Sequence, residues 1–425
     1  MNNRKAIKRY NNEIVFYQMN YPYVVSAFLR EMYMGIERGY SEFTLVSADP
    51  MITVYPNACL PISSLIEFYK KKGIVFTYDF DPNSYLNNCG FASPYILDSK
   101  EIADLDSPFD RIIKYDSPSQ VAAFTQKCVD NISHQVVCEE GIFPSLIWCI
   151  NEVMDNVLVH SKEEYGYVLA QFHPSTKHIA ICVADTGIGI YNSLRKSKHR
   201  PSRAIDALSL SIQEGVGDGA GQGNGLFGLY QIITENGGRL SLTSGPASLM
   251  LSAGKELKKY DDIPYLNKDN QCTIVDFQLD LNKKVDINTA FSTIGGFDGF
   301  DIRIDDMLQE DDALLYDVFS NCEGTATREA GKLLRNDVIN TIKRTNNRIV
   351  LDFSNVKSAS SSFLDEFLAK LVLDLGIITF CQTVKLTGMD DTIKYLSERS
   401  MYMRIFQEWG RREIPAAEEH RFGTR

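Results

Sequence analysis

The sequence predicts a mixed α/β protein with more than one domain. Three observations predict this: helical and strand-like patterns alternate along most of the chain, 44% of the residues are hydrophobic and 23% charged, and the chain has 425 residues. A chain of this length can bury two or three separate cores.

Residues 1–105 are predicted to form a small α/β domain. Helical patterns alternate there with strand-like runs, at residues 21–39, 42–48, 61–73 and 74–80. Residues 98–116, rich in Asp, Ser and Pro, are expected to be a linker.

A second domain is predicted over residues 117–282. Ser117 and Pro118 fit the cap and first position of a helix. An apolar helix, two strands, a helix and two strands are expected next, at residues 149–161, 165–174, 177–187, 224–238, 239–245 and 272–281. The Gly-, Pro- and Ser-containing segment 190–223 is expected to be mobile rather than part of the core. A polar insertion, 246–271, separates the last two strands.

A third domain is predicted over residues 298–410. The acidic stretch 298–317 is expected to be a solvated surface segment. Helical and strand patterns alternate after it, at residues 326–347, 348–356, 361–376, 381–388 and 390–400. Their order is similar to that in the first hundred residues, which leaves a duplicated fold open.

The charge balance disfavours some partners. With 55 acidic and 44 basic residues the formal net charge is −11, so direct binding to nucleic acid or to an anionic membrane is not expected. The basic N-terminus is not followed by an apolar segment, and no run of about 18 apolar residues occurs. We therefore expect a cytoplasmic protein.

A polar stripe interrupts the apolar helix "CINEVMDNVLVHS". Glu152, Asn156 and His160 recur every four residues, so on a helix they share one face. A carboxylate, an amide and an imidazole in a row are unusual on a core helix and indicate a binding site.

Two glycine-rich segments follow this helix. In "ADTGIGI", Asp185 ends a strand, and the next glycines permit a tight turn beside a flat ligand. In "GAGQGNGLFGLYQI", glycines precede a helix whose first amides could hold phosphate oxygens. Each segment alone is common, whereas the helix and both segments in this order are much more specific.

With these three motifs, residues 117–282 resemble the GHKL ATP-binding superfamily of type II topoisomerases, ninety-kilodalton heat-shock chaperones, sensor histidine kinases, mismatch-repair ATPases and anti-sigma-factor serine kinases. "NEVMDNVLVH" is similar to its N box, and "DTGIGI" and "GQGNGLFGL" to its two glycine boxes. The resemblance implies a left-handed α/β sandwich, the Bergerat fold, with ATP between helices and an antiparallel sheet.

The resemblance also implies roles for single residues. Asn156 would bind Mg²⁺, a cation that prefers oxygen ligands, and Glu152 would be the general base. Asp185 would accept a hydrogen bond from the adenine amino group, beside Gly187 and Gly189. The phosphates would be wrapped by Gly221, Gly223, Gly225 and Leu226.

Three features remain open within this resemblance. His160 could serve the site or simply pack. No lysine is clearly placed to bind phosphate, although four basic residues are eligible: Arg195, Lys196, Lys198 and Arg203. The insertion after Ser244 is unusual, so ATP hydrolysis is less secure than ATP binding.

The C-terminal stretch "LDFSNVKSASSSFLDEFLAKL" resembles a STAS-like domain, the fold of anti-sigma-factor antagonists. In such antagonists a serine at the start of this helix is phosphorylated by a GHKL kinase, and Ser361 best matches that position. The alternative is that Ser360, Ser361 and Ser362 only cap the helix. Residues 1–105 are expected to be a degenerate STAS-like unit without this serine cluster.

Together these resemblances predict an ATP-binding regulatory protein that couples Mg-ATP to the binding of protein partners through STAS-like domains. Whether it phosphorylates serine, hydrolyses ATP slowly or only binds ATP is left open, as is a homodimer. One alternative is a nucleotide-gated dimeric clamp ATPase, for which Lys283 or Lys284 would contact the γ-phosphate. Another is an interaction scaffold whose ATP site does not hydrolyse.

Overall fold

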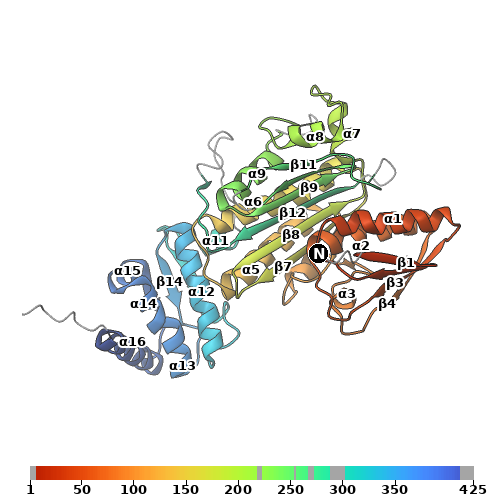
Figure 1. Cartoon of the computed structure of the whole chain (residues 1–425). Coiled ribbons are helices and arrows are strands. Elements are labelled where there is room, and N and C mark those ends of the chain that lie inside the picture. The colour runs from red at the N-terminus through yellow and green to blue at the C-terminus, as the bar shows by residue number, and fades with distance from the viewer. Residues whose placement is uncertain (1–5, 218–222, 253–254, 267–271, 288–301, 412–425) are drawn as a thin grey trace, which may run out of the picture. The chain divides into compact units, whose positions relative to one another are not determined.

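The computed structural model describes residues 6–217, 223–252, 255–266, 272–287 and 302–411. The chain divides into two compact units, the first with residues 1–132 and 138–299 and the second with residues 133–137 and 300–425. Both are mixed α/β, as the sequence predicts (Figure 1). The finer division into residues 1–105, 117–282 and 298–410 stays a prediction.

The N-terminal part of the first unit is built on a four-stranded sheet of order β1-β2-β3-β4, in which only β1 is antiparallel to its neighbour. Its elements are β1 (Ile7–Tyr10), β2 (Glu13–Phe16), α1 (Tyr23–Glu37), β3 (Glu42–Ser47), α2 (Pro56–Lys71), β4 (Val75–Asp79) and α3 (Tyr85–Asn88). Strands β1 and β2 were not predicted from the sequence, because each is only four residues long and polar on one face.

An eight-stranded sheet of order β11-β10-β9-β12-β8-β7-β6-β5 forms the middle of this unit. Its strands are β5 (Tyr95–Ile96), β6 (Ile113–Tyr115), β7 (Gly166–His173), β8 (His178–Asp185), β9 (Arg239–Ser244), β10 (Ala247–Leu251), β11 (Lys258–Tyr260) and β12 (Thr273–Asp280). The expected linker 98–116 contains the short helix α4 (Ser99–Ala103) and β6, whose Ile113 and Tyr115 are buried. The linker prediction is therefore wrong for these residues.

Helices cover one face of the sheet: α6 packs on β7 and β8, and α9 on β9 and β12. The helices on this side are α5 (Pro118–Gln135), α6 (Ile142–His160), α7 (Gly189–Arg195), α8 (Ala204–Ser211) and α9 (Gly225–Asn236). The expectation that residues 190–223 lie outside the core is wrong for α8, because Ile205 and Leu208 are buried where α8 packs on β10. Gly221 lies outside the described residues.

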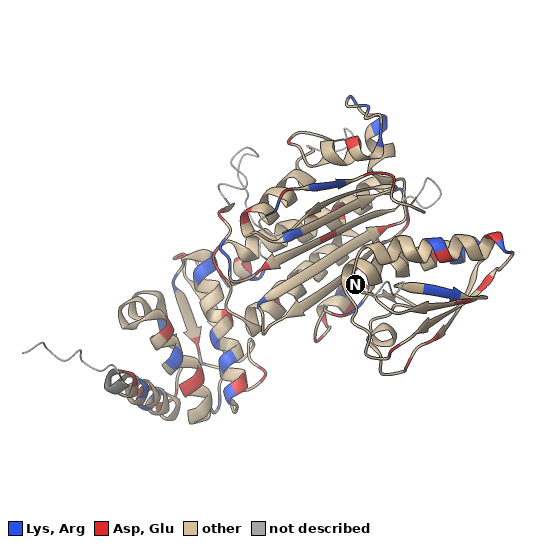
Figure 2. Cartoon of the chain, viewed as in Figure 1, with Lys and Arg blue, Asp and Glu red and all other residues tan. Residues whose placement is uncertain are grey.

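The other face of the sheet is covered by α2, which packs on β7, β8 and β12. Cys182 and Ala184 of β8 belong to the same hydrophobic core as the N-terminal strands and helices. Their neighbours Val183 and Asp185 point to the opposite face, since side chains alternate along a strand. Strands β7 and β8 carry almost no charged residues (Figure 2), as expected for a sheet buried on both faces.

The second unit has a parallel three-stranded sheet of order β13-β14-β15. Its elements are α11 (Ile302–Met307), β13 (Leu314–Asp317), α12 (Arg328–Thr345), β14 (Ile349–Asp352), α13 (Ser361–Leu364), the π-helical turn η2 (Asp365–Ala369), α14 (Lys370–Leu375), α15 (Ile377–Thr383), β15 (Val384–Thr387) and α16 (Asp391–Arg411). The acidic stretch 298–317 is not simply surface: Leu314 and Tyr316 of β13 are fully buried.

Residues 133–137 are an integral part of the second unit. Two asparagines of α12 donate hydrogen bonds to backbone oxygens of this segment. Asn336 Nδ2 lies 3.1 Å from the oxygens of both His134 and Gln135, and Asn340 Nδ2 lies 2.9 Å from that of Ser133 and 2.7 Å from that of Val136. These bonds satisfy carbonyl groups that the end of a helix leaves without helical partners.

Asp337, also on α12, is the buried charge of this unit. It accepts hydrogen bonds from Ser133, Tyr316 and Arg303 and lies 3.8 Å from His134 Nε2. Burial alone would raise its pKa, but Arg303 and His134 hold the pKa of Asp337 well below its usual range. The charged form is therefore the one that stabilises the second unit.

We predict that Asp337→Asn destabilises the second unit by about 3 kcal/mol, because it leaves the Arg303 charge without its buried partner. The stabilisation is present above the unfolded-state pKa near 4 and is lost as the pH falls, so acidification should affect the variant less. Native-state hydrogen exchange of α12 measures this stability. Glu329→Gln, at an exposed site on the same helix, should change it by about 0.5 kcal/mol or less. Equal effects of the two variants would contradict the prediction.

Candidate functional site

A cavity of about 510 Å³ lies against one face of the eight-stranded sheet. Its walls come from α6, α7, α8, α9, β8 and β12. The volume is in the range that holds a drug-sized ligand. Seven of the site residues predicted from the sequence line it: Glu152, Asn156, Asp185, Gly189, Gly223, Gly225 and Leu226. Three separated segments of the chain therefore meet around one space.

Helix α6 supplies the polar wall of the cavity. Glu152, Asn156 and His160 all line it, and Asp155, which the sequence analysis did not single out, lines it too. Burial, followed by the nearby charge of Asp155, raises the pKa of Glu152. A carboxyl group whose pKa is raised toward neutrality is suited to accept a proton.

Asp185 ends β8 at the floor of the cavity and is 3% exposed. The Gly187 amide donates a 2.8 Å hydrogen bond to its Oδ1. Burial outweighs this bond and raises the pKa of Asp185 to about 7. The carboxyl group therefore changes its charge in the physiological range.

The first glycine segment packs on the end of α6. A Cβ on Gly187 would lie 2.1 Å from the backbone oxygen of Ser161, so only glycine fits there. Gly187 itself does not line the cavity but sets the turn beside it, and the Ile188 amide bonds to the same Ser161 oxygen at 3.0 Å. Gly189, with φ of 75°, has the left-handed conformation that glycine adopts without strain.

The second glycine segment brings the start of α9 against the polar wall. A Cβ on Gly225 would lie 2.3 Å from Glu152 Oε2 and 3.3 Å from Asn156 Nδ2. Asn224, the residue that precedes α9, makes no capping hydrogen bond with its side chain. The partial positive charge of a helix start therefore faces the two side chains that the sequence singled out first.

The charged residues described around the cavity are acidic. Glu152, Asp155 and Asp185 line it, and none of its described lining residues is lysine or arginine. Of the basic residues considered from the sequence, Arg203 binds Asp206 and Asp261 instead. An anionic ligand would therefore need a cation to neutralise the site, and Asn156 with the carboxylates offers the oxygen ligands that Mg²⁺ prefers.

Ser361 lies in the second unit, where the serine cluster begins a helix. Ser360 is the cap: its Oγ accepts a 3.0 Å hydrogen bond from the Phe363 amide and donates one of 2.8 Å to the Ala326 oxygen. Ser362 is half-buried, with its Oγ 3.0 Å from Ser360 Oγ. Ser361 is exposed, so capping occupies its neighbour and leaves the Ser361 hydroxyl accessible.

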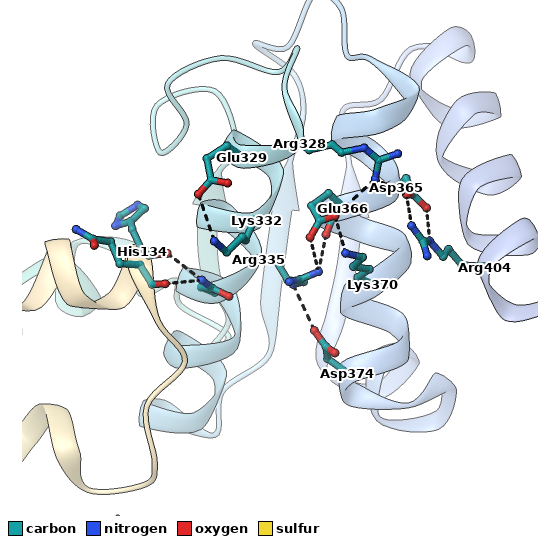
Figure 3. A network of polar contacts seen from close by, with 12 residues as sticks. His134, Arg328, Glu329, Lys332, Arg335, Asp365, Glu366, Lys370, Asp374 and Arg404 are labelled. Atoms are coloured by element: carbon teal, nitrogen blue, oxygen red, sulfur yellow. Dashed lines mark hydrogen bonds and ion pairs between the residues drawn. The ribbon is translucent and has the colours of Figure 1, made fainter. Parts of the chain in front are cut away.

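An ionic network holds the helix that starts at Ser361 (Figure 3). Two 2.6 Å hydrogen bonds join Arg404 of α16 to Asp365, and Arg404 is the main cause that lowers the pKa of this carboxyl. On the other side, Glu366 pairs with Arg335 of α12 at 3.1 Å and with Lys370 at 2.6 Å. The sequence does not reveal this network, because its members come from α12, η2, α14 and α16.

Residues 330–394 match the model of a STAS-like domain of unknown function, DUF4325. The third domain predicted from the sequence therefore contains a STAS-like domain, a kind that commonly mediates protein interactions. No match was found among curated proteins or among solved structures. These comparisons detect no GHKL domain, so that resemblance rests on the motifs and on the cavity that they line.

We predict that Asp185→Asn stabilises the protein above pH 7. The folded-state pKa of about 7 lies above the unfolded value, so ionisation of Asp185 lowers the free energy of unfolding as the pH rises from about 4 to 7. The amide removes this penalty, which is of the order of a few kcal/mol, and keeps an acceptor for the Gly187 amide.

Thermal unfolding at pH 4 and pH 8 measures the effect: the gain should be fully present at pH 8 and small at pH 4, where both the folded and the unfolded carboxyl keep most of their protons. Asp276→Asn is the matched control on the neighbouring strand β12. Asp276 faces α2, where its Oδ2 lies 3.3 Å from Asn57 Nδ2, and burial raises its pKa to about 6. The Asp276→Asn variant should therefore also be more stable than the wild-type chain at pH 8. A lower free energy of unfolding for Asp185→Asn at pH 8 would contradict the prediction, because it would show that ionisation of Asp185 does not destabilise the folded protein.

Proposed function

We propose that this chain is a cytoplasmic ATP-binding regulatory protein of the GHKL superfamily, which couples Mg-ATP binding to the binding of protein partners through STAS-like domains. One observation carries the proposal: residues of three motifs, far apart in the sequence, line a single cavity of suitable volume. A chance occurrence of the motifs would not bring Glu152, Asp185 and Gly225 around one space.

The cavity supports a definite placement of the ligand. Asn156 would bind Mg²⁺ at the start of α9, where Gly225 lets the backbone approach Glu152 and Asn156 closely, and the first amides of α9 would hold phosphate oxygens. Glu152, next to Asn156 on the same wall, would take a proton from the attacking hydroxyl or water. Asp185 would accept the adenine amino hydrogen at the other end. Because the lining is acidic, ATP would enter as its magnesium complex.

The exposed hydroxyl of Ser361 favours serine phosphorylation as the chemistry that accompanies ATP binding. Ser360 already caps the helix, so the capping alternative does not require Ser361. A phosphate at this position would add negative charge one turn before Asp365 and change the surface that a partner meets. Slow hydrolysis, with Glu152 activating water, is the second outcome.

The clamp alternative is less well supported. Its γ-phosphate lysine would be Lys283 or Lys284, but Lys283 pairs with Asp280 at 3.6 Å and Lys284 with Glu140 at 2.7 Å. Neither lysine is among the described residues that line the cavity.

The N-terminal part is proposed to be a degenerate STAS-like unit. Its segment β2-α1-β3-α2-β4 is similar in strand and helix order to β13-α12-β14-(α13 to α15)-β15, and both sets of strands are parallel and sequential. It has no counterpart of Ser361, since α2 starts with Pro56 after an uncapped Tyr55. We assign it a role in scaffolding or dimerisation.

Incubation of the purified chain with Mg²⁺ and γ-labelled ATP tests the chemistry. The proposal predicts label on serine that is lost in Ser361→Ala and falls at least 100-fold in Glu152→Gln, because the amide cannot accept the proton. Ser358→Ala, at an exposed serine of the preceding loop, is the control and should keep the label. Free phosphate without label would favour the ATPase. Neither product, with ATP still bound, would favour the scaffold.

The affinity for Mg-ATP should fall as the pH is lowered through about 7, since the ionised Asp185 carboxylate is a stronger acceptor for the adenine amino hydrogen than the protonated group. We expect a decrease of at most about tenfold per pH unit below pH 7. Titration calorimetry at pH 6, 7 and 8 measures it, and Asp276→Asn should leave the profile unchanged. A flat profile would remove Asp185 from the site.

A further inference from the structure

The insertion between β9 and β12 is the feature that the proposed function does not explain. Its described residues are 246–252 and 255–266. They add two strands to the sheet: β10 pairs with β9, with Leu249 opposite Leu242, and β11 pairs with β10, with Lys259 opposite Leu249. The insertion is therefore an ordered extension of the sheet.

One side of the insertion supports α8. This helix packs on β10 and β9, and Ile205 and Leu208 of α8 are buried together with Leu249 of β10. Lys259 Nζ also donates a 2.9 Å hydrogen bond to Ser209 Oγ, and Arg203 pairs with Asp261 at 3.4 Å. The two polar contacts are exposed and weak, so the buried apolar contacts hold the helix.

The position of α8 matters to the cavity. Its last residue, Ser211, is 6% exposed and lines the cavity, as do Ser193 and Leu194 of α7, against which α8 also packs. A movement of α8 relative to β10 would therefore open or close this wall.

The far end of the insertion is built into the N-terminal part of the chain. Leu266 is 4% exposed and belongs to the same hydrophobic core as helices α1 and α2. Ser26 Oγ of α1 donates a 3.0 Å hydrogen bond to the Pro264 oxygen, and the rings of Tyr33 and Tyr265 lie 6.0 Å apart. The Ile263 amide bonds to the Pro246 oxygen at 2.8 Å, which ties this end back to the start of the insertion.

We propose that residues 246–252 and 255–266 form a strap through which the N-terminal part of the chain sets the position of α8 and thereby the rate at which nucleotide leaves the cavity. The strap contacts α1 at one end and α8 at the other, and its two strands are joined by a hydrogen-bonded ladder. A partner that displaces α1 would loosen α8. The part of the proposal that concerns nucleotide rests on the proposed function, whereas the mechanical coupling does not.

Two variants loosen the α1 end of the strap. Tyr265→Ala removes the aromatic ring on the strap. Tyr33→Ala removes the ring of α1 that lies against it, and changes no residue of the strap or of the buried core, since Tyr33 is 49% exposed. Tyr23→Ala is the matched control, since this exposed tyrosine of the same helix contacts Tyr21 and Gln18 instead.

Hydrogen exchange of residues 204–211 without nucleotide is the first measurement. The strap predicts an increase of about tenfold in both Tyr265→Ala and Tyr33→Ala, equivalent to about 1.4 kcal/mol of local stability, and no change in Tyr23→Ala. Unchanged exchange of α8, with faster exchange confined to α1 and residues 263–266, would overturn the coupling.

The release rate of a fluorescent ATP analogue in the presence of Mg²⁺ is the second measurement. Faster release in the two strap variants, by a factor similar to that of the exchange rate, is the expected result. If exchange rises and release does not, α8 does not control nucleotide exit and the proposal fails. If the wild-type chain does not bind the analogue, the proposed function fails, while the exchange measurement still decides the coupling.

Discussion

The close approach of glycine backbone to α6 is the constraint on which the cavity depends. A Cβ at Gly187 would meet the Ser161 oxygen at 2.1 Å, one at Gly225 would meet Glu152 at 2.3 Å, and one at Gly228 would meet the Trp148 ring at 2.2 Å. Three glycines therefore bring their backbone into close contact with α6 and its C-terminal end. These contacts place the turn after β8 at the C-terminal end of α6 and the start of α9 beside Glu152 and Asn156.

The same packing accounts for the electrostatics of the site. Carboxyl groups enclosed by backbone and apolar side chains lose hydration, so the pKa values of Glu152 and Asp185 rise. A cation and hydrogen-bond donors from a ligand would offset this cost. A buried carboxyl group with a raised pKa on a cavity wall is therefore a candidate binding group.

Much of this site could be predicted from the sequence, because its signals are local. The four-residue spacing of Glu152 and Asn156 fixes one helix face, and the glycines mark turns wherever they fold. The long, strongly periodic helices and the apolar strands β7, β8 and β12 were predicted for the same reason. The structure places these segments around one cavity. Their order in the sequence suggested this proximity but could not show it.

The parts that the sequence missed depend on contacts between distant segments. Helix α8 is short, and its burial follows from packing on β10, a strand of an insertion that reads as polar. Strand β13 lies in an acidic stretch but buries Tyr316 beside Asp337, a residue of another element. The placement of residues 133–137 in the second unit depends on the side chains of Asn336 and Asn340, which no pattern near residue 133 reveals.

The central claim is that Mg-ATP occupies this cavity, and a hydrogen-exchange footprint tests it most directly. Mg-ATP should protect the amides of residues 152–161, 185–194 and 223–229, and should leave the strands of the second unit unchanged. Asn156→Ala should abolish the protection. Saturating Mg-ATP that protects none of these segments, or protects them equally in Asn156→Ala, would contradict the account.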